Sequence, residues 1–264
     1  MDISTSVVKA AIQGREIQAA IQPVIDINSN KYHSVEALAR LNNVPTPTLI
    51  AMADELEVGY MVSLQVFELA LRAYCNQPHP ININLSPRQL IHPNSFKAIT
   101  ILLEAYNYPP SMLTVELTES PLPSNSHQLK QVIRSLIGEG VRLSLDDFGV
   151  EGQCLQRVLE LPIQQIKIDR SFITNIHQIG IKQDIVGSII ELSAKHQIEV
   201  ICEGVETITE SDYLKSIGAH LQQGYHWAKP TLIENLEIEL DTLGVSNNAN
   251  KLEFAQSLVA HNNF

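Results

Sequence analysis

Short segments in which apolar and polar residues alternate recur along most of the chain, and longer segments with helical spacing separate them. The segment 143–149 is the clearest, because Leu143 and Leu145 alternate with Ser144 and Asp146. Comparable strand patterns lie at 17–27, 33–41, 81–86, 113–119, 165–169, 199–203 and 220–227. Helices are predicted at 1–16, 49–57, 61–76, 95–106, 126–138, 155–161, 182–196, 209–217, 232–243 and 251–261. Strands separated by helices predict a largely parallel sheet.

This alternation predicts an α/β fold of the TIM-type (β/α)8 barrel class, since about eight strands over roughly 250 residues is the size of such a barrel. A doubly wound open sheet is the alternative, but no glycine-rich phosphate loop follows the first strand. Pro23 interrupts the first strand, which predicts an edge or a bulge there. No linker or charge run separates a second domain. We therefore expect one domain over 1–264, with a barrel core at about 17–235, a lead-in helix at 1–16 and a helical tail at 236–264.

Composition limits the classes of binding partner and the location that the sequence is compatible with. The formal charge of −11 argues against a nucleic-acid polymer or an anionic membrane surface, because both are bound through clustered Lys and Arg. The three cysteines are far apart, which excludes a disulfide framework and a CxxC site: Cys75, Cys154 and Cys202. No apolar run approaches the ~18 residues of a membrane-spanning helix, and the N-terminus has no signal-peptide pattern. We expect no membrane insertion and a cytoplasmic location.

Seven of the predicted strands carry one polar residue among apolar neighbours, on the face opposite the one that packs against helices. These residues are Glu36, Asn84, Glu116, Asp146, Lys167, Glu203 and Gln223. A single carboxylate in a strand is usually a satisfied structural residue. Seven separate strands with this pattern indicate a site, because catalytic residues of a barrel come from the carboxyl ends of several strands.

The residue types restrict the chemistry of that site. With Asp147, five carboxylates face one lysine, so the cluster must be partly protonated or bind cations. Oxygen ligands with one Asn carbonyl suit Mg²⁺, Mn²⁺ or Ca²⁺ better than zinc. Two metals about 4 Å apart are the usual clamp for in-line displacement at phosphorus. Lys167 could orient or help deprotonate the attacking water, with its pKa lowered in a buried site that holds cations, or it could pair with the carboxylates.

Several blocks of the sequence together resemble one known family. They are Gln22-Pro23, Glu36-Ala-Leu38 with Arg40, Asn84-Leu-Ser86, Glu116-Leu-Thr-Glu-Ser120, Asp146-Asp-Phe-Gly149, Lys167-Ile-Asp-Arg-Ser-Phe172, Glu203-Gly-Val-Glu-Thr207, Gln223-Gly-Tyr225 and Lys229-Pro230. In this order, over roughly residues 17–235, the set resembles the EAL domain, the family of cyclic di-GMP phosphodiesterases.

The resemblance implies a barrel that hydrolyses cyclic di-GMP to linear pGpG with two divalent cations, Mg²⁺ or Mn²⁺, and with Ca²⁺ as an inhibitor. The metal ligands would be Glu36, Asn84, Glu116, Asp146 and Asp147. Lys167 and Glu203 would act on the attacking water. Gln22, Arg40 and Gln223 would bind the substrate, and Glu119 and Glu206 would organise the loops and ligands around it. The resemblance also implies a homodimer.

The sequence departs from the family pattern mainly after Gly149. The family continues Thr-Gly-Tyr-Ser-Ser-Leu, whereas this chain reads Val150-Glu-Gly-Gln-Cys-Leu155. The change affects the expected turnover rate and dimerisation but removes no ligand. The alternative function is therefore a catalytically weak or inactive EAL domain that acts as a cyclic di-GMP receptor or protein-interaction module. Regulatory input could come from an unidentified partner protein.

Overall fold

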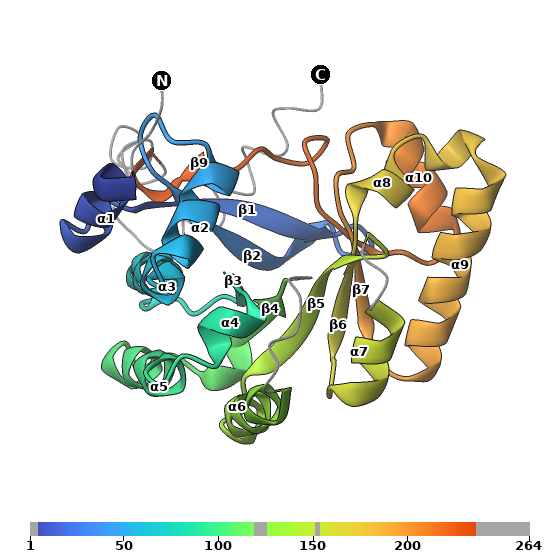
Figure 1. Ribbon diagram of the computed structural model, residues 1–264. Coiled ribbons are helices and arrows are strands. Elements are labelled where there is room, and N and C mark those ends of the chain that lie inside the picture. Colours follow the sequence, from blue (N-terminus) through green and yellow to red (C-terminus); the bar gives the residue numbers. More distant parts are fainter. Residues whose placement is uncertain (1–4, 119–125, 151–153, 236–264) are drawn as a thin grey trace.

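The computed structural model describes residues 5–118, 126–150 and 154–235, and its centre is a closed barrel (Figure 1). The strands are β1 (Gln18–Asp26), β2 (Lys31–Arg40), β3 (Ile81–Leu85), β4 (Leu113–Leu117), β5 (Arg142–Phe148), β6 (Gln165–Ile168), β7 (Glu199–Cys202) and β8 (Leu221–Gln222). They pair in chain order from β2 to β8, and β1 closes the ring by pairing with both β8 and β2. The predicted TIM-type barrel is confirmed.

Strand β1 runs antiparallel to both of its neighbours in the ring, whereas β2 to β8 are mutually parallel. The connection from β1 to β2 is a short turn, in which Asp26 accepts from the backbone N–H of Asn28 (3.0 Å) and the hydroxyl of Ser29 (2.8 Å). A parallel pair would need a crossover of a dozen or more residues. The turn is far too short for that, so the first two strands form a hairpin.

Two short strands pair with the edge of β1 that does not face β2, and Pro23 lies between the two positions at which they pair. Strand β9 (Thr231–Leu232) pairs at Ala20 and Ile21, and β8 pairs at Ile25 and Asp26. The register of the β1–β2 ladder shifts one residue after Pro23, between Val24 and Ile25. The ladder is irregular close to Pro23, in line with the predicted edge or bulge, and Pro23 itself pairs with neither β8 nor β9.

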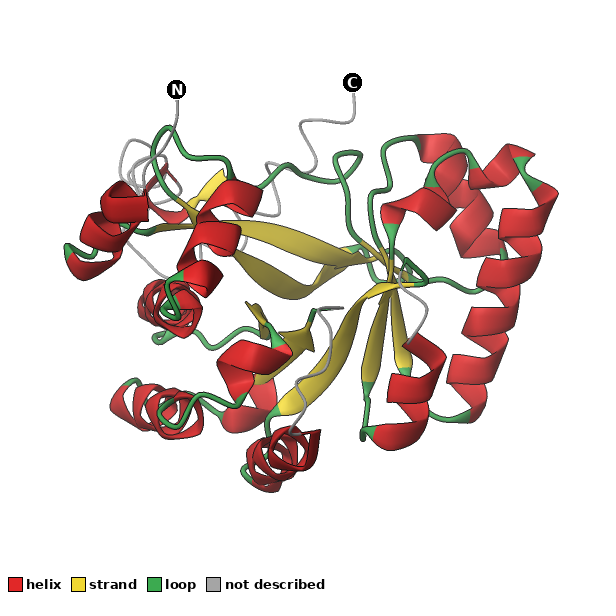
Figure 2. Ribbon diagram, in the orientation of Figure 1, coloured by secondary structure: helices red, strands yellow, loops and turns green. Residues whose placement is uncertain are grey.

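Ten helices surround the strands in the described part of the chain (Figure 2). They are α1 (Thr5–Gln13), α2 (Thr46–Glu55), α3 (Gly59–Tyr74), α4 (Pro87–Leu90), α5 (Ser95–Ala105), α6 (Ser126–Gly138), α7 (Cys154–Glu160), α8 (Arg170–Ile173), α9 (Gly180–Lys195) and α10 (Ile208–Ser216), with 3₁₀ turns at Pro110–Met112 and Ile176–Gln178. None of these helices has the length and apolar character needed to cross a membrane.

Three details differ from the sequence-based expectation. The one-turn helices α4 and α8 were not predicted, because one turn is too short for a 3.6-residue period to show. The last barrel strand is only Leu221–Gln222, so the strand predicted at 220–227 is wrong in length. Leu232 belongs to β9, and the terminal helix begins at residue 233. The rest of the predicted tail, and residues 1–4 of the lead-in helix, lie outside the described residues.

The hydrophobic core lies between the barrel and its helices. Ile81, Ile83 and Leu85 of β3 are buried on the outward face, against helices such as α3, which contributes Phe67 and Leu71. Burying a side chain of this size contributes roughly 1.5–3 kcal/mol. Because this outer layer supplies the apolar burial, the inward positions of the same strands are free to be polar.

A histidine is buried just before β3. His79 is 8% exposed, and its backbone N–H donates to the hydroxyl of Tyr108 over 3.0 Å. The rings of Tyr32 and Tyr74 lie 6.4 and 6.1 Å from its ring, centroid to centroid. Burial, with a smaller contribution from the charge of His33, lowers the pKa of His79 to about 4.

This lowered pKa predicts acid sensitivity of the fold. As the pH falls below the ordinary pKa of 6.5, His79 binds a proton in the unfolded chain but stays neutral in the folded protein down to about pH 4. Protonation therefore favours the unfolded state, and stability is lost. His79→Gln should lose about 2 kcal/mol less unfolding free energy than the wild type between pH 7 and pH 5. Urea unfolding at the two pH values measures the difference. An equal loss in both proteins would contradict the assignment.

Candidate active site

Lys167 of β6 is the centre of a buried charge cluster at the carboxyl ends of the strands. Its side chain is 1% exposed. Its Nζ lies close to one oxygen of each of four carboxylates: Glu203 (2.6 Å), Glu116 (2.9 Å), Glu36 (3.2 Å) and Asp146 (3.2 Å). The barrel thus brings together five of the predicted site residues, from β2, β4, β5 and β6 and from the position directly after β7.

The sequence predicts a lowered pKa for Lys167 in a site that holds cations, whereas the carboxylates of the structure by themselves raise this pKa. Burial by itself lowers the pKa of Lys167, but the surrounding carboxylates, Asp146 and Glu116 foremost, outweigh burial and raise the pKa well above its usual range. With the carboxylates alone, the charged ammonium is the stabilised form. These contacts are salt bridges, and the role of Lys167 toward the attacking water stays a prediction.

The carboxylates repel one another and are deprived of solvent. Burial, reinforced by the charge of Glu36, raises the pKa of Glu116 well above its ordinary value. Burial also raises the pKa of Asp146, and it raises that of Glu203 to about 8 despite the nearby ammonium. One lysine therefore does not supply enough positive charge for the cluster, and a cation would relieve the repulsion.

Glu36 is the exception, because two amides donate to it. Burial raises its pKa, but Lys167 and these donors outweigh burial and leave the pKa below its usual value. The Nδ2 of Asn84 lies 2.6 Å from Oε1 of Glu36, and the Nε2 of Gln223 lies 2.9 Å from Oε2. Gln22 stands opposite Glu36 in the β1–β2 ladder, and its Oε1 lies 3.4 Å from the Nε2 of Gln223. The reversed direction of β1 thus places Gln22 beside the cluster.

A bulge in β5 explains how two adjacent aspartates can serve one site. In a regular strand, Asp146 and Asp147 would point to opposite faces. The β5–β6 ladder instead shifts register between Leu145 and Phe148, and Asp147 has a φ of 51°, in the left-handed region that Asp tolerates better than most residues. Carboxylate oxygens of Asp146, Asp147 and Glu203 can all lie within 4.8 Å of one another.

This donor set fits a divalent cation. All three groups offer hard oxygen ligands, as Mg²⁺ and Mn²⁺ prefer. The raised pKa of Asp146 and of Glu203 shows that negative charge there is insufficiently compensated. Cation binding at this end of the barrel is therefore chemically reasonable.

Two predicted site residues, Arg40 and Glu206, make the following contacts outside the cluster, and a third is not described. The Nη1 of Arg40 donates to the carbonyl of Ala39 (2.8 Å) and to Oγ1 of Thr46 (3.2 Å) at the end of β2. Glu206 pairs with Arg170 over 2.9 Å. Glu119 lies outside the described residues. The roles assigned to these three residues stay predictions.

Asn82 is a site residue that the sequence reasoning missed. It is fully buried, and its Nδ2 lies 2.8 Å from Oε1 of Glu116. The available signal was its position two residues before Asn84, on the same face of β3.

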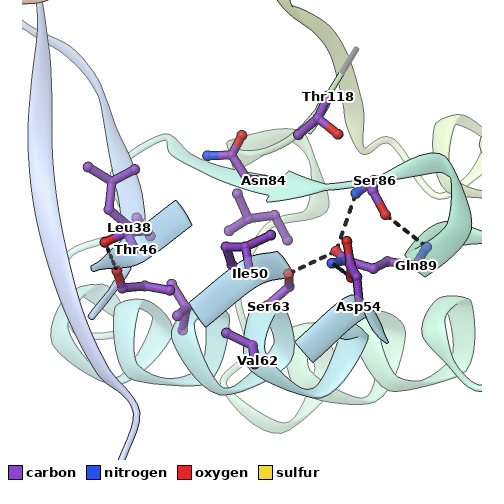
Figure 3. Close-up of a pocket in the computed structure, with 14 residues that line it drawn as sticks. Leu38, Thr46, Ile50, Asp54, Val62, Ser63, Asn84, Ser86, Gln89 and Thr118 are labelled. Carbon is purple, nitrogen blue, oxygen red and sulfur yellow. Dashed lines mark hydrogen bonds between the residues drawn. The ribbon is translucent and has the colours of Figure 1, made fainter. Parts of the chain in front are cut away.

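A cavity of about 200 Å³ lies beside Asn84, between β2, β3, α2 and α3 (Figure 3). At one end, Gln89 joins three elements: its Oε1 accepts from Ser63 Oγ (3.1 Å) and from the N–H of Ser86 (3.2 Å), while its Nε2 donates to Asp54 (2.8 Å). Ser86 directly follows β3. These bonds therefore fix the chain where it leaves the strand that carries Asn84.

Comparison with known proteins agrees with this geometry. The sequence model of the EAL domain matches residues 6–230, and the chain belongs to the EAL domain family.

Two curated relatives are each 30% identical to the chain. The signaling protein YkoW of Bacillus subtilis aligns with 88% of this chain and 30% of its own length, and the cyclic di-GMP phosphodiesterase PdeR of Escherichia coli with 84% and 35%. The chain thus spans about a third of the length of these relatives. Klebsiella pneumoniae BlrP1, solved as a manganese/cy-diGMP complex, superimposes with a TM-score of 0.76 at 29% identity, over 83% of this chain and 57% of that one.

Removal of the central ammonium should destabilise the fold. Lys167→Met leaves three buried carboxylates and half-buried Glu203 without their cationic partner, which we expect to cost roughly 3–5 kcal/mol of unfolding free energy. Added Mn²⁺ should recover part of this loss. Chemical unfolding with and without Mn²⁺ measures both effects. Lys195→Met is the control, because Lys195 is exposed and pairs with exposed Glu191 on α9. If the two variants are equally stable, the cluster is not organised by Lys167.

The second aspartate should matter for cations rather than for folding. Asp147→Asn keeps a residue that tolerates the left-handed conformation but removes one charge. We expect Mn²⁺ affinity to fall at least about 10-fold and the melting temperature to stay equal or rise. Calorimetric Mn²⁺ titration and thermal unfolding test the two parts. An Mn²⁺ affinity within twofold of the wild type would exclude Asp147 as a ligand.

Proposed function

We propose that the chain is a metal-dependent phosphodiesterase that hydrolyses one phosphodiester of cyclic di-GMP to give linear pGpG. The observation that carries the proposal is the buried cluster around Lys167 at the carboxyl ends of the barrel strands. Membership of the EAL family supports it, as do the similarity to the cyclic di-GMP phosphodiesterase PdeR and the ligands of the BlrP1 complex.

Two divalent cations, Mg²⁺ or Mn²⁺, would be held by the predicted ligands Glu36, Asn84, Glu116, Asp146 and Asp147. When bound, such cations neutralise phosphate charge and make water a stronger nucleophile at neutral pH. This matches a cluster in which Glu116, Asp146 and Glu203 have raised pKa values, and in which, among the described residues, Lys167 is the one cationic side chain.

Lys167 and Glu203 are the residues we assign to the attacking water. Glu203 Oε1 lies 2.6 Å from Lys167 Nζ, so the pair can share a proton. Because the pKa of Glu203 is raised to about 8, its carboxylate is a stronger base than an ordinary one. Lys167 Nζ would orient the water, and Glu203 would accept the proton that the water loses on attack.

Substrate contacts are assigned to Gln22, Gln223 and Arg40. The two glutamines lie beside Glu36, and Gln22 is held by donation to the carbonyl of Ala228 over 3.0 Å. The guanidinium of Arg40 has five N–H donors in a fixed fork that matches phosphate oxygens. Its Nη1 bonds to Ala39 and Thr46 would hold that fork at the end of β2.

We further infer a homodimer. Val150, Leu155 and Leu159 are 58%, 64% and 87% exposed where β5 leads into α7, and the two leucines share a helix face. This apolar surface would be covered by a second copy of the chain. A regulatory partner protein and a cytoplasmic location stay predictions from the sequence.

The deciding experiment is to incubate the purified protein with cyclic di-GMP and Mg²⁺ or Mn²⁺, and to detect pGpG by chromatography. Glu36→Ala should lower turnover at least about 100-fold, because loss of a ligand should exceed the 10–100-fold effect typical of an outer partner. Glu191→Ala, on the exposed face of α9, should keep wild-type turnover. Ca²⁺ in place of Mg²⁺ should give no product.

The outcomes separate the alternatives. Product that requires both metal and Glu36 would establish the phosphodiesterase. Binding of intact cyclic di-GMP without product would make the chain a receptor. Absence of both would leave a protein-interaction module.

A further inference from the structure

Two side-chain amides, those of Asn82 and Gln165, form a file that extends from the charge cluster down the inside of the barrel. Asn82 is the first member: its Nδ2 lies 2.8 Å from Glu116 Oε1 and 3.4 Å from Gln165 Oε1. The Nε2 of Gln165 lies 3.4 Å from Oε2 of Glu199, which pairs with Arg142. Asn82 and Gln165 are 0% and 1% exposed, so bulk water does not compete for these contacts.

The two oxygens of Glu116 have different donors. Lys167 Nζ contacts Oε2 at 2.9 Å, and Asn82 Nδ2 contacts Oε1 at 2.8 Å. A single donor would leave the carboxylate free to turn about its last side-chain bond, whereas two donors on opposite oxygens fix its plane. Within the described part of the chain, the orientation of Glu116 therefore depends on Asn82 as well as on Lys167.

The direction of each amide in the file is determined by its neighbours. A carboxylate that ligates a cation is ionised and only accepts hydrogen bonds, so Asn82 turns its NH₂ group toward Glu116. Gln165 then accepts from Asn82 with its oxygen and donates to Glu199 with its nitrogen. Glu199, held by Arg142 at the opposite end of the barrel, fixes the direction of Gln165. The 3.4 Å contacts are longer than ordinary hydrogen bonds, so the Asn82–Glu116 bond is the strong member.

We propose that Asn82 is a positioning residue for the metal site, which holds the Glu116 carboxylate in the plane needed to bind a divalent cation, and that Gln165 maintains the direction of the Asn82 amide. The inference rests on the proposed function, because it assigns Glu116 to that metal site. Groups that hydrogen-bond to a ligating carboxylate typically contribute 10–100-fold to metal affinity. A contribution of this size is the expected effect.

The test is calorimetric titration of the full chain with MnCl₂. Asn82→Leu removes both donors at similar volume and should weaken Mn²⁺ binding about 10- to 100-fold. Gln165→Leu should have a smaller effect, and the double variant should lose less than the sum, because both changes act through one amide. Asn82→Ser is the second variant if the leucine does not fold. Thermal unfolding of every variant confirms a folded barrel.

Ser34→Ala is the matched control. Ser34 lies on β2, two residues before Glu36, and is 1% exposed, with a hydroxyl that has no hydrogen-bond partner among the described residues. Its removal deletes a buried polar group near the cluster without touching a carboxylate donor. It should leave the Mn²⁺ affinity unchanged.

Turnover supplies a second readout. The lowered kcat of Asn82→Leu should recover with increasing Mn²⁺, while KM for cyclic di-GMP at saturating Mn²⁺ stays close to the wild-type value. A purely structural role would lower the melting temperature without this recovery.

Three results would overturn the inference. A folded Asn82→Leu or Asn82→Ser that binds Mn²⁺ like the wild type excludes the positioning role. An equal loss in Ser34→Ala shows a general effect of barrel packing. A wild type that binds no Mn²⁺ rejects the proposed metal site itself, and that result is distinguishable because it does not depend on any variant.

Discussion

The contact between one buried ammonium and four carboxylates is the constraint on which the rest of the structure depends. Lys167 is surrounded by Glu36, Glu116, Asp146 and Glu203, and burial makes every unbalanced charge among them costly. The barrel brings these groups together because the carboxyl ends of its parallel strands lie at one end. The free energy that holds them there must come from elsewhere in the fold, since like charges at this distance oppose it.

That free energy comes from the outward face of the same strands. A TIM-type barrel usually fills its interior with bulky branched side chains, whereas this interior is polar at the level of Asn82, Glu116 and Lys167. Apolar residues such as Ile83 and Leu117 face the helices instead and are fully buried there. The fold thus separates stabilisation, in the outer layer, from chemistry, in the inner one. The amides inside the barrel satisfy and orient the carboxylates at the same time.

Two local irregularities complete the site. The hairpin at the start of the chain reverses β1 and sets Gln22 opposite Glu36. The bulge in β5 allows Asp147 to join Asp146, which a regular strand would prevent. Each irregularity disturbs a regular ladder, and each adds a polar group at the carboxyl end of the barrel. Both lie at the candidate site, and irregular backbone is commonly found at functional sites.

The sequence by itself determined the class of fold, most of the strands and the polar face that carries the cluster, because a period of two assigns every strand residue to one of two faces. It did not determine how deep each side chain lies in the barrel or which residue that side chain contacts. Asn82 and Asn84 share a face, but only the β3–β4 pairing and the closure of the barrel decide that Asn84 meets Glu36 while Asn82 meets Glu116. The direction of β1, the bulge at Asp147 and the position of Arg40 outside the cluster also required the tertiary structure. Those features depend on register and on contacts between residues far apart in the chain, which local periodicity does not encode.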